Sequence, residues 1–310
     1  MKRCYPVIIP TLNRCEHLKC CVESLAKNPY AKDTELVIGL DYPPTDKYQA
    51  GYDMIKEYLP SIRGFSKVTI LTSQHNLGVV ENCKRLREYV QSCGFDGFIF
   101  TEDDNEFSPN FLEYMNWGLN TFRDDSSILG ICGFKRVNVD FLENNVYKYP
   151  KFVAWGCGFW FSKYEKKEKY NDFTLLQKWI DSQSLRICFT DRVRVAYAVL
   201  NMLKKKVIYG DYLTNMVPIK ERNFIFPKVS MVRNHGWDGS GLHGGTASVN
   251  EYYLNLPIAS DTHFTPLIVT DLYDKRLKDV YRKAYKTKVS KVLINNFVFV
   301  FYKLTGHNLV

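Results

Sequence analysis

The chain has 310 residues, of which 45% are hydrophobic and 24% charged, and this composition excludes a disordered protein. Its net charge of +9 is concentrated at the end of the chain, where nine Lys and Arg residues from Lys275 onward accompany a single acid, Asp279. Because the remainder is nearly neutral, the composition argues against a nucleic-acid-binding protein.

The apolar pattern predicts strands that alternate with helices over the first half of the chain. In chain order, the expected elements are a strand at 5–10, a helix at 15–26, a strand at 36–40, a helix at 49–59, a strand at 68–71, a helix at 80–90, a strand at 98–101, a helix at 111–122, a strand at 128–134, helices at 172–182 and 191–206, and a strand followed by a Gly-rich loop at 224–245. Alternation at crossover spacing predicts an α/β fold with a mostly parallel, doubly wound sheet.

Ligands of such sheets bind at the carboxyl ends of the strands, and polar residues follow several of the expected strands. The most informative is the run Glu102, Asp103 and Asp104 after the apolar residues 98–100. Three adjacent acids repel one another, so a divalent cation that bridges them to a diphosphate is one interpretation. A solvated acidic turn is the alternative.

Two other strand ends carry a residue that could bind a ligand, and for each residue a purely structural role is the alternative. Asp41 either accepts hydrogen bonds from a ribose or base, or forms an Asx turn before two prolines. Arg14 either pairs with a phosphate or lies on the surface at the start of a helix.

The first half resembles GT-A-fold, family-2-type glycosyltransferases. The resemblance rests on the opening strand and loop Pro6–Arg14, on the strand end at Asp41, and on the turn Asn76-Leu77-Gly78. Residues 101–114 are similar to the Glu-Asp-Asp strand end and following helix of N-acetylglucosaminyltransferase I and its relatives. That similarity implies metal binding by Asp104 and a ribose contact by Asp103.

The second half resembles bacterial polysaccharide sugar transferases of the same superfamily. Residues 154–160, with Trp155 and Gly156, are similar to a loop that faces the sugar, and residues 236–243 to a Gly-rich loop that covers the donor. The resemblance implies that His243 could reach the metal or diphosphate, whereas His235 is interpreted as structural. Together, the expected donor-binding residues are Thr11, Asn13, Arg14, Asp41, Asn76, Gly78, Glu102, Asp103, Trp155 and Gly156.

Transfer of a sugar to a hydroxyl needs a general base within hydrogen-bond reach of that hydroxyl. By resemblance, Asp211 occupies the position of this base, although Gly210 replaces the usual flanking tryptophan. Asp191 is the second candidate and reads more simply as a helix cap.

The cysteines and the basic tail indicate where the protein works. Nine cysteines without a CxxC pair favour free thiols in a reducing compartment and disfavour a zinc site. No secretion signal and no apolar run of ~20 residues is present, so we expect a cytoplasmic protein. The basic and apolar residues 275–310 suggest peripheral contact with an anionic membrane surface, or else a helix packed on the catalytic domain.

These observations predict a metal-dependent glycosyltransferase with Mn²⁺ or Mg²⁺ as cofactor. It would move a sugar from a nucleotide-sugar donor, UDP-sugars favoured, to a glycan or lipid-linked glycan in surface polysaccharide synthesis, with inversion implied by the resemblance. A nucleotide-binding half at 1–110, an acceptor-binding half at 111–260 and a helical tail at 261–310 are expected. The alternatives are a sugar-phosphate nucleotidyltransferase, disfavoured because residues 11–14 lack glycine, and an inactive glycan-binding GT-A module.

Overall fold

The computed structural model describes residues 4–163, 180–190, 192–204, 223–240, 251–284 and 289–307. Its helices and strands, with η marking short 3₁₀ helices, are β1 (Val7–Thr11), α1 (Cys15–Ala26), η1 (Ala31–Asp33), β2 (Glu35–Leu40), η2 (Asp46–Tyr48), α2 (Gln49–Tyr58), η3 (Leu59–Ser61), β3 (Lys67–Thr72), α3 (Gly78–Ser92), β4 (Gly97–Phe100), β5 (Asn105–Phe107), α4 (Phe111–Thr121), β6 (Ile128–Cys132), β7 (Val146–Tyr149), β8 (Cys157–Trp160), α7 (Ile187–Thr190), α8 (Arg192–Lys204), β9 (Asn223–Pro227), β10 (Val232–Asn234), η4 (Gly236–Asp238), α10 (Glu251–Leu254), α11 (Lys275–Ala284) and α12 (Val289–Thr305).

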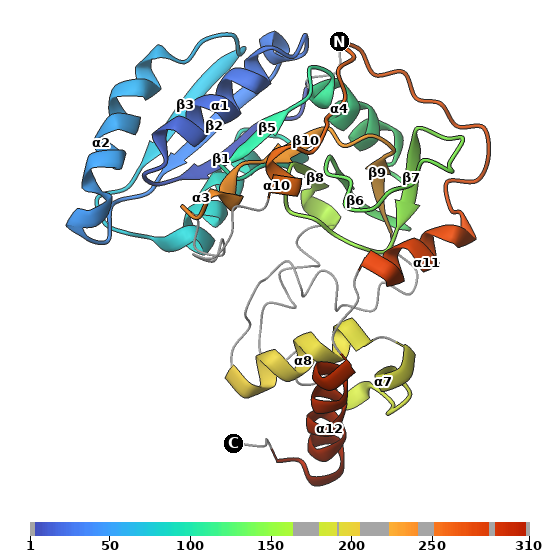
Figure 1. The fold of residues 1–310 in the computed structure, drawn as a ribbon. Helices are drawn as coiled ribbons and strands as arrows, with labels where there is room; N and C mark the ends of the chain where they lie inside the picture. Colours follow the sequence, from blue (N-terminus) through green and yellow to red (C-terminus); the bar gives the residue numbers. More distant parts are fainter. Residues whose placement is uncertain are drawn as a thin grey trace.

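Eight strands form one mixed sheet in the order β3-β2-β1-β4-β8-β6-β9-β7, with helices packed around it (Figure 1). The strands β1 to β4 are parallel to one another, and β6 is parallel to β9. In contrast, β8 runs antiparallel to both β4 and β6, and β7 runs antiparallel to β9. The first four strands therefore confirm the predicted parallel sheet, and the second half makes it mixed.

The residue patterns explain why the central strands form. All five residues of β1 are buried, as expected for a strand covered on both faces. The helix α1 begins and ends at the predicted residues and buries Leu18, Val22 and Leu25 along one face. Four short strands, β5, β7, β8 and β10, were not predicted, and the helix expected at 172–182 lies mostly outside the described residues.

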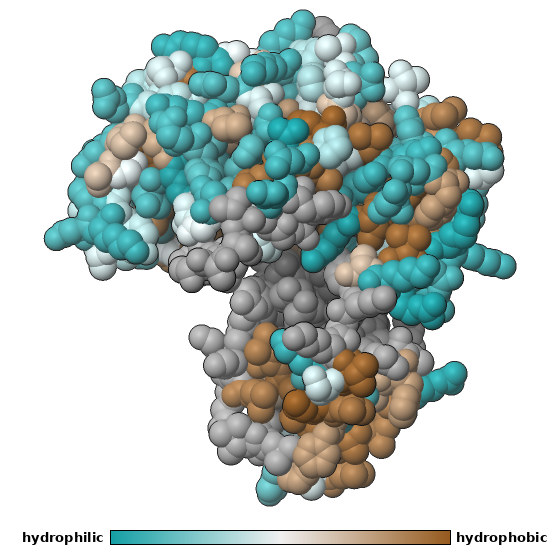
Figure 2. All heavy atoms as spheres, in the orientation of Figure 1, coloured by the Kyte–Doolittle hydropathy of each residue, from teal (hydrophilic) through white to brown (hydrophobic). Residues whose placement is uncertain are grey.

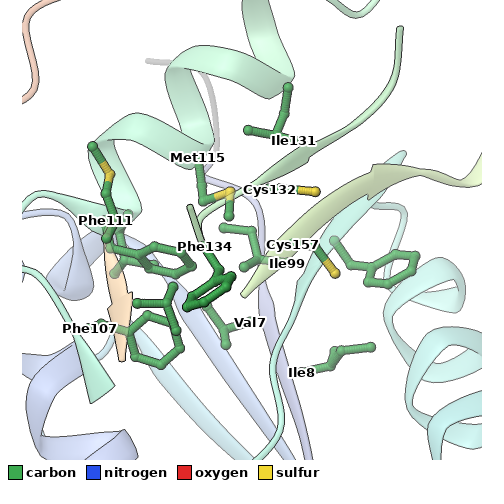
Figure 3. Packing of buried hydrophobic residues seen from close by; sticks show 14 of the residues in the cluster. Val7, Ile8, Ile99, Phe107, Phe111, Met115, Ile131, Cys132, Phe134 and Cys157 are labelled. Carbon is green, nitrogen blue, oxygen red and sulfur yellow. The ribbon is translucent and has the colours of Figure 1, made fainter. Parts of the chain in front are cut away.

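A second, two-stranded sheet joins β5 to β10 in antiparallel register, with Asn234 opposite Asn105. Between this ribbon and α4 lies an aromatic part of the core, where Phe107, Phe111 and Phe134 face one another (Figure 3). The ring centroids of Phe107 and Phe111 are 4.3 Å apart. This packing fixes the ribbon, and with it the residues that follow β4 and β10.

The basic tail divides between two hydrophobic clusters. The helix α11 belongs to the main core, because the buried Tyr281 stacks on Tyr149 with ring centroids 3.8 Å apart. The helix α12 instead lies beside α8, and the two share a small separate cluster that includes the fully buried Phe299 (Figure 1). Among the described helices, none has the length and apolar character needed to cross a bilayer. The division of the chain at residues 110 and 260 stays a prediction.

Candidate active site

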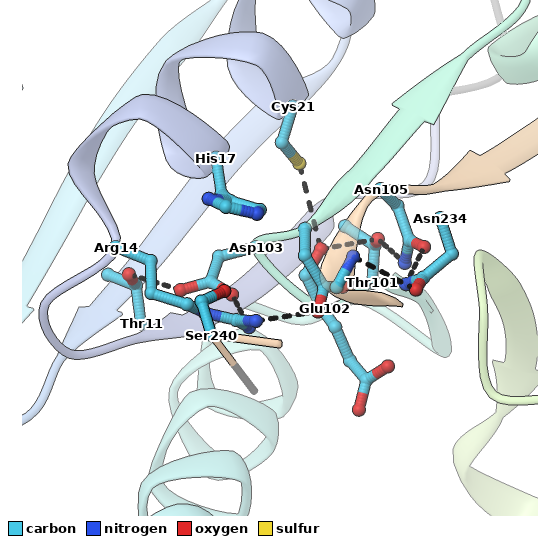
Figure 4. Close-up of polar contacts among 12 residues, drawn as sticks. Thr11, Arg14, His17, Cys21, Thr101, Glu102, Asp103, Asn105, Asn234 and Ser240 are labelled. Atoms are coloured by element: carbon cyan, nitrogen blue, oxygen red, sulfur yellow. Dashed lines mark hydrogen bonds and ion pairs between the residues drawn. The ribbon is translucent and has the colours of Figure 1, made fainter. Parts of the chain in front are cut away.

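The carboxyl ends of β1 and β4 bring one hydroxyl, one guanidinium and two carboxylates together. The two strands are parallel neighbours, so Thr11 and the residues after Phe100 emerge at the same edge of the sheet. Thr11 Oγ1 donates a hydrogen bond of 2.8 Å to Asp103 Oδ2. Arg14 lies across both acids and forms ion pairs with Asp103 through Nη2 and with Asp104 through Nη1, the latter at 2.8 Å (Figure 4).

This cluster is removed from solvent, which strengthens its electrostatics. Asp103 is 4% exposed and Asp104 is 8% exposed. Burial, opposed by Arg14 and assisted by the charge of Asp104, raises the pKa of Asp103 above its ordinary value. Burial alone would lower the pKa of Arg14, but the two carboxylates reverse this effect and raise it. Arg14 thus stays charged and neutralises part of a carboxylate pair that would otherwise repel itself.

The segment after β10 covers the other side of Asp104. Asn234 donates a hydrogen bond of 2.8 Å from Nδ2 to Asp104 Oδ1, and the His235 backbone N–H donates to the Asp104 carbonyl at 2.8 Å. At Gly236 an added Cβ would lie 2.2 Å from Asp104 Oδ2, so only glycine allows the chain to pass so closely. Asn234 therefore holds the Asp104 carboxylate by a hydrogen bond, and Gly236 lets the backbone pass directly beside it.

Asp41 is bound by the turn that begins α3. Its carboxylate accepts backbone hydrogen bonds from Tyr42, Leu77 and Gly78, each of 2.9 Å, and a weaker one of 3.2 Å from the Asn76 side chain. These bonds organise the Asn76–Gly78 turn. They are not those of an Asx turn, in which the carboxylate accepts from the N–H two residues further on, because that residue is Pro43 and has no N–H. Direct contact of Asp41 with a ribose or base stays a prediction and would require one of these four donors to move.

Asp41 also connects to the acidic pair through the backbone. Its N–H donates a hydrogen bond of 3.0 Å to the Thr11 carbonyl, while the Thr11 hydroxyl contacts Asp103. Asn13 lies in the loop between β1 and α1, which approaches α2 so closely that a Cβ on Gly51 would meet the Asn13 carbonyl at 2.0 Å. The expected nucleotide-binding residues thus form one continuous edge.

The aromatic residue expected to face the sugar lies beside the segment after β10. Trp155 packs edge-on against Phe134, with ring centroids 4.5 Å apart, and against Trp237 at 6.4 Å. Gly156 has a φ of +62°, and a Cβ there would press on Val232. The loop before β8 therefore requires glycine at this position and carries Trp155 toward Trp237.

The side chains of Glu102, Asp103 and Asp104 do not form one three-carboxylate metal site among the residues that the structure describes. Within the described part of the chain, Glu102 is not grouped with Asp103 and Asp104 as a set of metal-ligating atoms. Mg²⁺ and Mn²⁺ are commonly held by one or two carboxylates together with phosphate oxygens, so the buried Asp104, with Asp103 beside it, still fits such an ion.

Several residues at this edge were not expected from the sequence. Asn234 contacts Asp104, and His17 on α1 pairs with Asp238 at 3.1 Å (Nε2 to Oδ2). Burial alone would raise the pKa of Asp238, but hydrogen bonds from Ser240 and nearby positive charge lower it. The available signal for Asn234 was a polar residue two positions before the Gly-rich segment that begins at Gly236.

The remaining expected residues lie outside the described part of the chain. They are the candidate bases Asp211 and Asp191 and the possible metal ligand His243. Their roles stay predictions.

Known proteins resemble this chain in family and fold. A model described as "Glycosyl transferase family 2" matches residues 7–179, more than half of the chain. Similar solved structures include the mannosyltransferase PcManGT from Pyrobaculum calidifontis in complex with GDP-Man and Mn²⁺, at 16% identity and a TM-score of 0.37, with 52% of this chain and 46% of that chain covered. S. aureus TarS is 11% identical with a TM-score of 0.35, and the match covers 67% of this chain and 41% of that chain. Mouse xyloside xylosyltransferase 1, in its apo form, is 10% identical with a TM-score of 0.36, and the match covers 57% of this chain and 74% of that chain.

The chain thus spans less than half the length of the first two of these proteins. No curated protein sequence gives a significant match. The family match and the mostly parallel mixed sheet with its flanking helices together confirm the predicted GT-A-like fold.

Proposed function

Because this chain belongs to glycosyl transferase family 2, we propose that it transfers a sugar from a nucleotide-sugar donor to a glycan or lipid-linked glycan acceptor. The single observation that carries this proposal is the buried pair Asp103 and Asp104, which share Arg14 at the carboxyl ends of β1 and β4. An anionic diphosphate needs positive charge at such a place, and the site already holds a guanidinium there.

Asp104 would hold the divalent ion, Mn²⁺ or Mg²⁺, together with donor phosphate oxygens. When bound, that ion neutralises negative charge developing on the departing diphosphate. Arg14 now occupies Asp104 Oδ2, so it must leave this oxygen when a ligand binds there. The freed guanidinium can then pair with phosphate oxygens in a bidentate manner.

The neighbouring residues would position the nucleoside. Asp103, whose carboxylate is oriented by the Thr11 hydroxyl, would accept a hydrogen bond from the ribose. The Asp41 carboxylate would support the base-binding edge by holding the turn at Asn76–Gly78. The proposal also includes a uridine base, inversion at the anomeric carbon, and Asp211 as the general base, with Asp191 as the second candidate.

A lipid-linked acceptor is supported by the surface of the helical lobe, which comprises α7, α8 and α12. On α12 the side chains of Leu293, Ile294 and Phe297 are each more than 60% exposed, and Figure 2 shows apolar atoms gathered over this lobe. Phe189 on α7 is 79% exposed. Apolar residues combined with the Lys- and Arg-rich segment from Lys275 onward are typical of a peripheral contact with anionic lipid. Such a contact would suit an enzyme of surface polysaccharide synthesis.

Flotation of the full chain with vesicles tests this contact. Wild type should float with vesicles that contain phosphatidylserine, and the Leu293→Ser/Phe297→Ser double variant should float less. Leu185→Ser, a less exposed site of the same lobe, serves as the control. Equal flotation of wild type and the double variant would contradict membrane contact through α12.

Hydrolysis of nucleotide sugars with and without Mn²⁺ tests the enzymatic proposal. Wild type should release the nucleotide only with the metal, and Asp104→Asn should lose about 10²–10³-fold in rate, the loss typical of removing a group that stabilises developing charge. Asp53→Asn alters an exposed carboxylate on α2 and should leave the rate unchanged. Donor binding by wild type without any turnover would instead favour an inactive glycan-binding module.

A further inference from the structure

A second cluster of metal-ligating side chains lies beside the acidic pair and contributes nothing to the proposed transfer. It consists of Cys20 on α1, Glu106 on β5 and His235 after β10, whose candidate ligand atoms all lie within 4.8 Å of one another. In the described part of the chain it is the one group of three or more His, Cys, Asp or Glu side chains arranged in this way. We propose that these three residues bind a thiophilic divalent ion such as Zn²⁺.

The donor set distinguishes this cluster from the Asp104 site. Thiolate and imidazole are ligands that Zn²⁺ prefers, and a carboxylate completes a common three-residue set. Mg²⁺ and Mn²⁺ prefer oxygen ligands, which are what the acidic pair offers. The two sites should therefore take different ions.

The present contacts are ones that a metal ion can replace. His235 Nε2 lies 2.8 Å from Glu106 Oε2, at hydrogen-bond distance. Tetrahedral Zn²⁺ bonds of roughly 2.0–2.3 Å place ligand atoms roughly 3.3–3.8 Å apart. The ring and the carboxylate would need to separate by less than about 1 Å. Binding releases the proton on the ring and the proton on the Cys20 thiol.

Supporting contacts orient the carboxylate and leave space beside the thiol. Arg233 Nη1 lies 3.0 Å from Glu106 Oε2, and its Nε donates to the Leu256 carbonyl at 2.9 Å, so the guanidinium is held in place and keeps Glu106 ionised. Carboxylates that ligate metals are commonly hydrogen-bonded in this manner. Cys20 and Glu106 also line a surface hollow of about 280 Å³, which can supply water as the fourth ligand.

The ion would join three elements that are distant in sequence. Cys20 belongs to α1, whereas Glu106 and His235 lie on the two strands of the β5–β10 ribbon or directly after it. His235 also donates its backbone N–H to the Asp104 carbonyl. A bound ion would therefore fix the base of the segment that covers the acidic pair, whether or not the proposed transfer takes place.

Titration of the reduced full chain with Co²⁺ tests the inference, because a cobalt–thiolate bond gives an absorption band that oxygen and nitrogen ligands do not. Wild type should show this band at one equivalent and lose it when Zn²⁺ is added. Cys20→Ser should abolish the band, and His235→Asn should weaken Zn²⁺ binding at least tenfold. Circular dichroism of each variant reports whether the fold is intact.

Two further variants separate this site from other thiols and from the acidic pair. Cys93→Ser changes a cysteine of similar exposure at the end of α3 and should keep the band, as should Asp104→Asn. A wild-type chain without the band, or a band that survives in Cys20→Ser, would overturn the inference. So would loss of the band in Asp104→Asn alone. None of these outcomes depends on sugar transfer, so they leave the proposed function to its own test.

Discussion

Substitution of Gly236 by alanine should displace the carboxylate at the centre of the proposed site. The new Cβ would lie 2.2 Å from Asp104 Oδ2, whereas ordinary van der Waals contacts begin at 3.4 Å, so one group must move by about 1 Å. Asp104 cannot yield freely, because Arg14 holds the same oxygen and Asn234 holds the other. Misplacement of a catalytic group by 1 Å can cost about 10²-fold in rate.

We therefore expect Gly236→Ala to lose about 10²-fold in Mn²⁺-dependent hydrolysis of nucleotide sugars. Overpacking costs about 1–3 kcal/mol, less than the stability of a typical domain, so the variant should stay folded in urea titrations. Gly239→Ala is the matched control, because it strains a φ of +89° in the same segment but its Cβ meets nothing within 4 Å. A rate for Gly236→Ala within twofold of wild type, or an equal loss in Gly239→Ala, would refute the displacement of Asp104.

Three further outcomes follow from contacts elsewhere. Hydrogen bonds with Cys20 and then Glu106 raise the pKa of His235 to about 9, so its contribution to folding is complete below pH 6.5 and is lost as the pH rises to about 9. In the presence of a chelator, urea titrations should show a fall of about 1–2 kcal/mol between pH 6 and 9, after discounting for partial exposure, and His235→Gln should flatten it. Asp41→Asn places an amide against backbone N–H donors and should cost about 2–3 kcal/mol in the same assay, with no cost in the exposed control Asp53→Asn. Phe299→Ala should cost about 3–5 kcal/mol in the α8–α12 cluster, visible as faster amide exchange in α12 before the main sheet is affected; uniform acceleration across the chain would contradict two separate clusters.

The amino-terminal half of the fold could be predicted because its signals are local. β1 is an unbroken apolar strand, and α1 repeats apolar residues at helical spacing, so both were located to within two residues. Once adjacent parallel strands are assumed, the meeting of Arg14 with Asp103 and Asp104 follows from the geometry of the sheet. The sequence thus indicated the core of the candidate site.

The rest of the site depends on pairings that leave no local signal. β5 and β10 have three residues each, too few for an alternating pattern, and they pair across more than 120 residues. This pairing alone brings Asn234 to Asp104 and His235 to Glu106. The spacing of the cysteines also disfavoured a zinc site. Sequence spacing cannot reveal a ligand set that combines one cysteine with two residues from other helices or strands.

The position of Arg14 has a consequence for the order in which ligands arrive. The Arg14 guanidinium pairs with Asp104. A metal ion that arrives alone therefore meets a positive charge at this carboxylate and gains little by binding there. A diphosphate offers the arginine an alternative anion and vacates the carboxylate in the same event. Metal and nucleotide should therefore each bind weakly alone and tightly as a complex, so that the proposed site would select a metal-bound diphosphate over free ions.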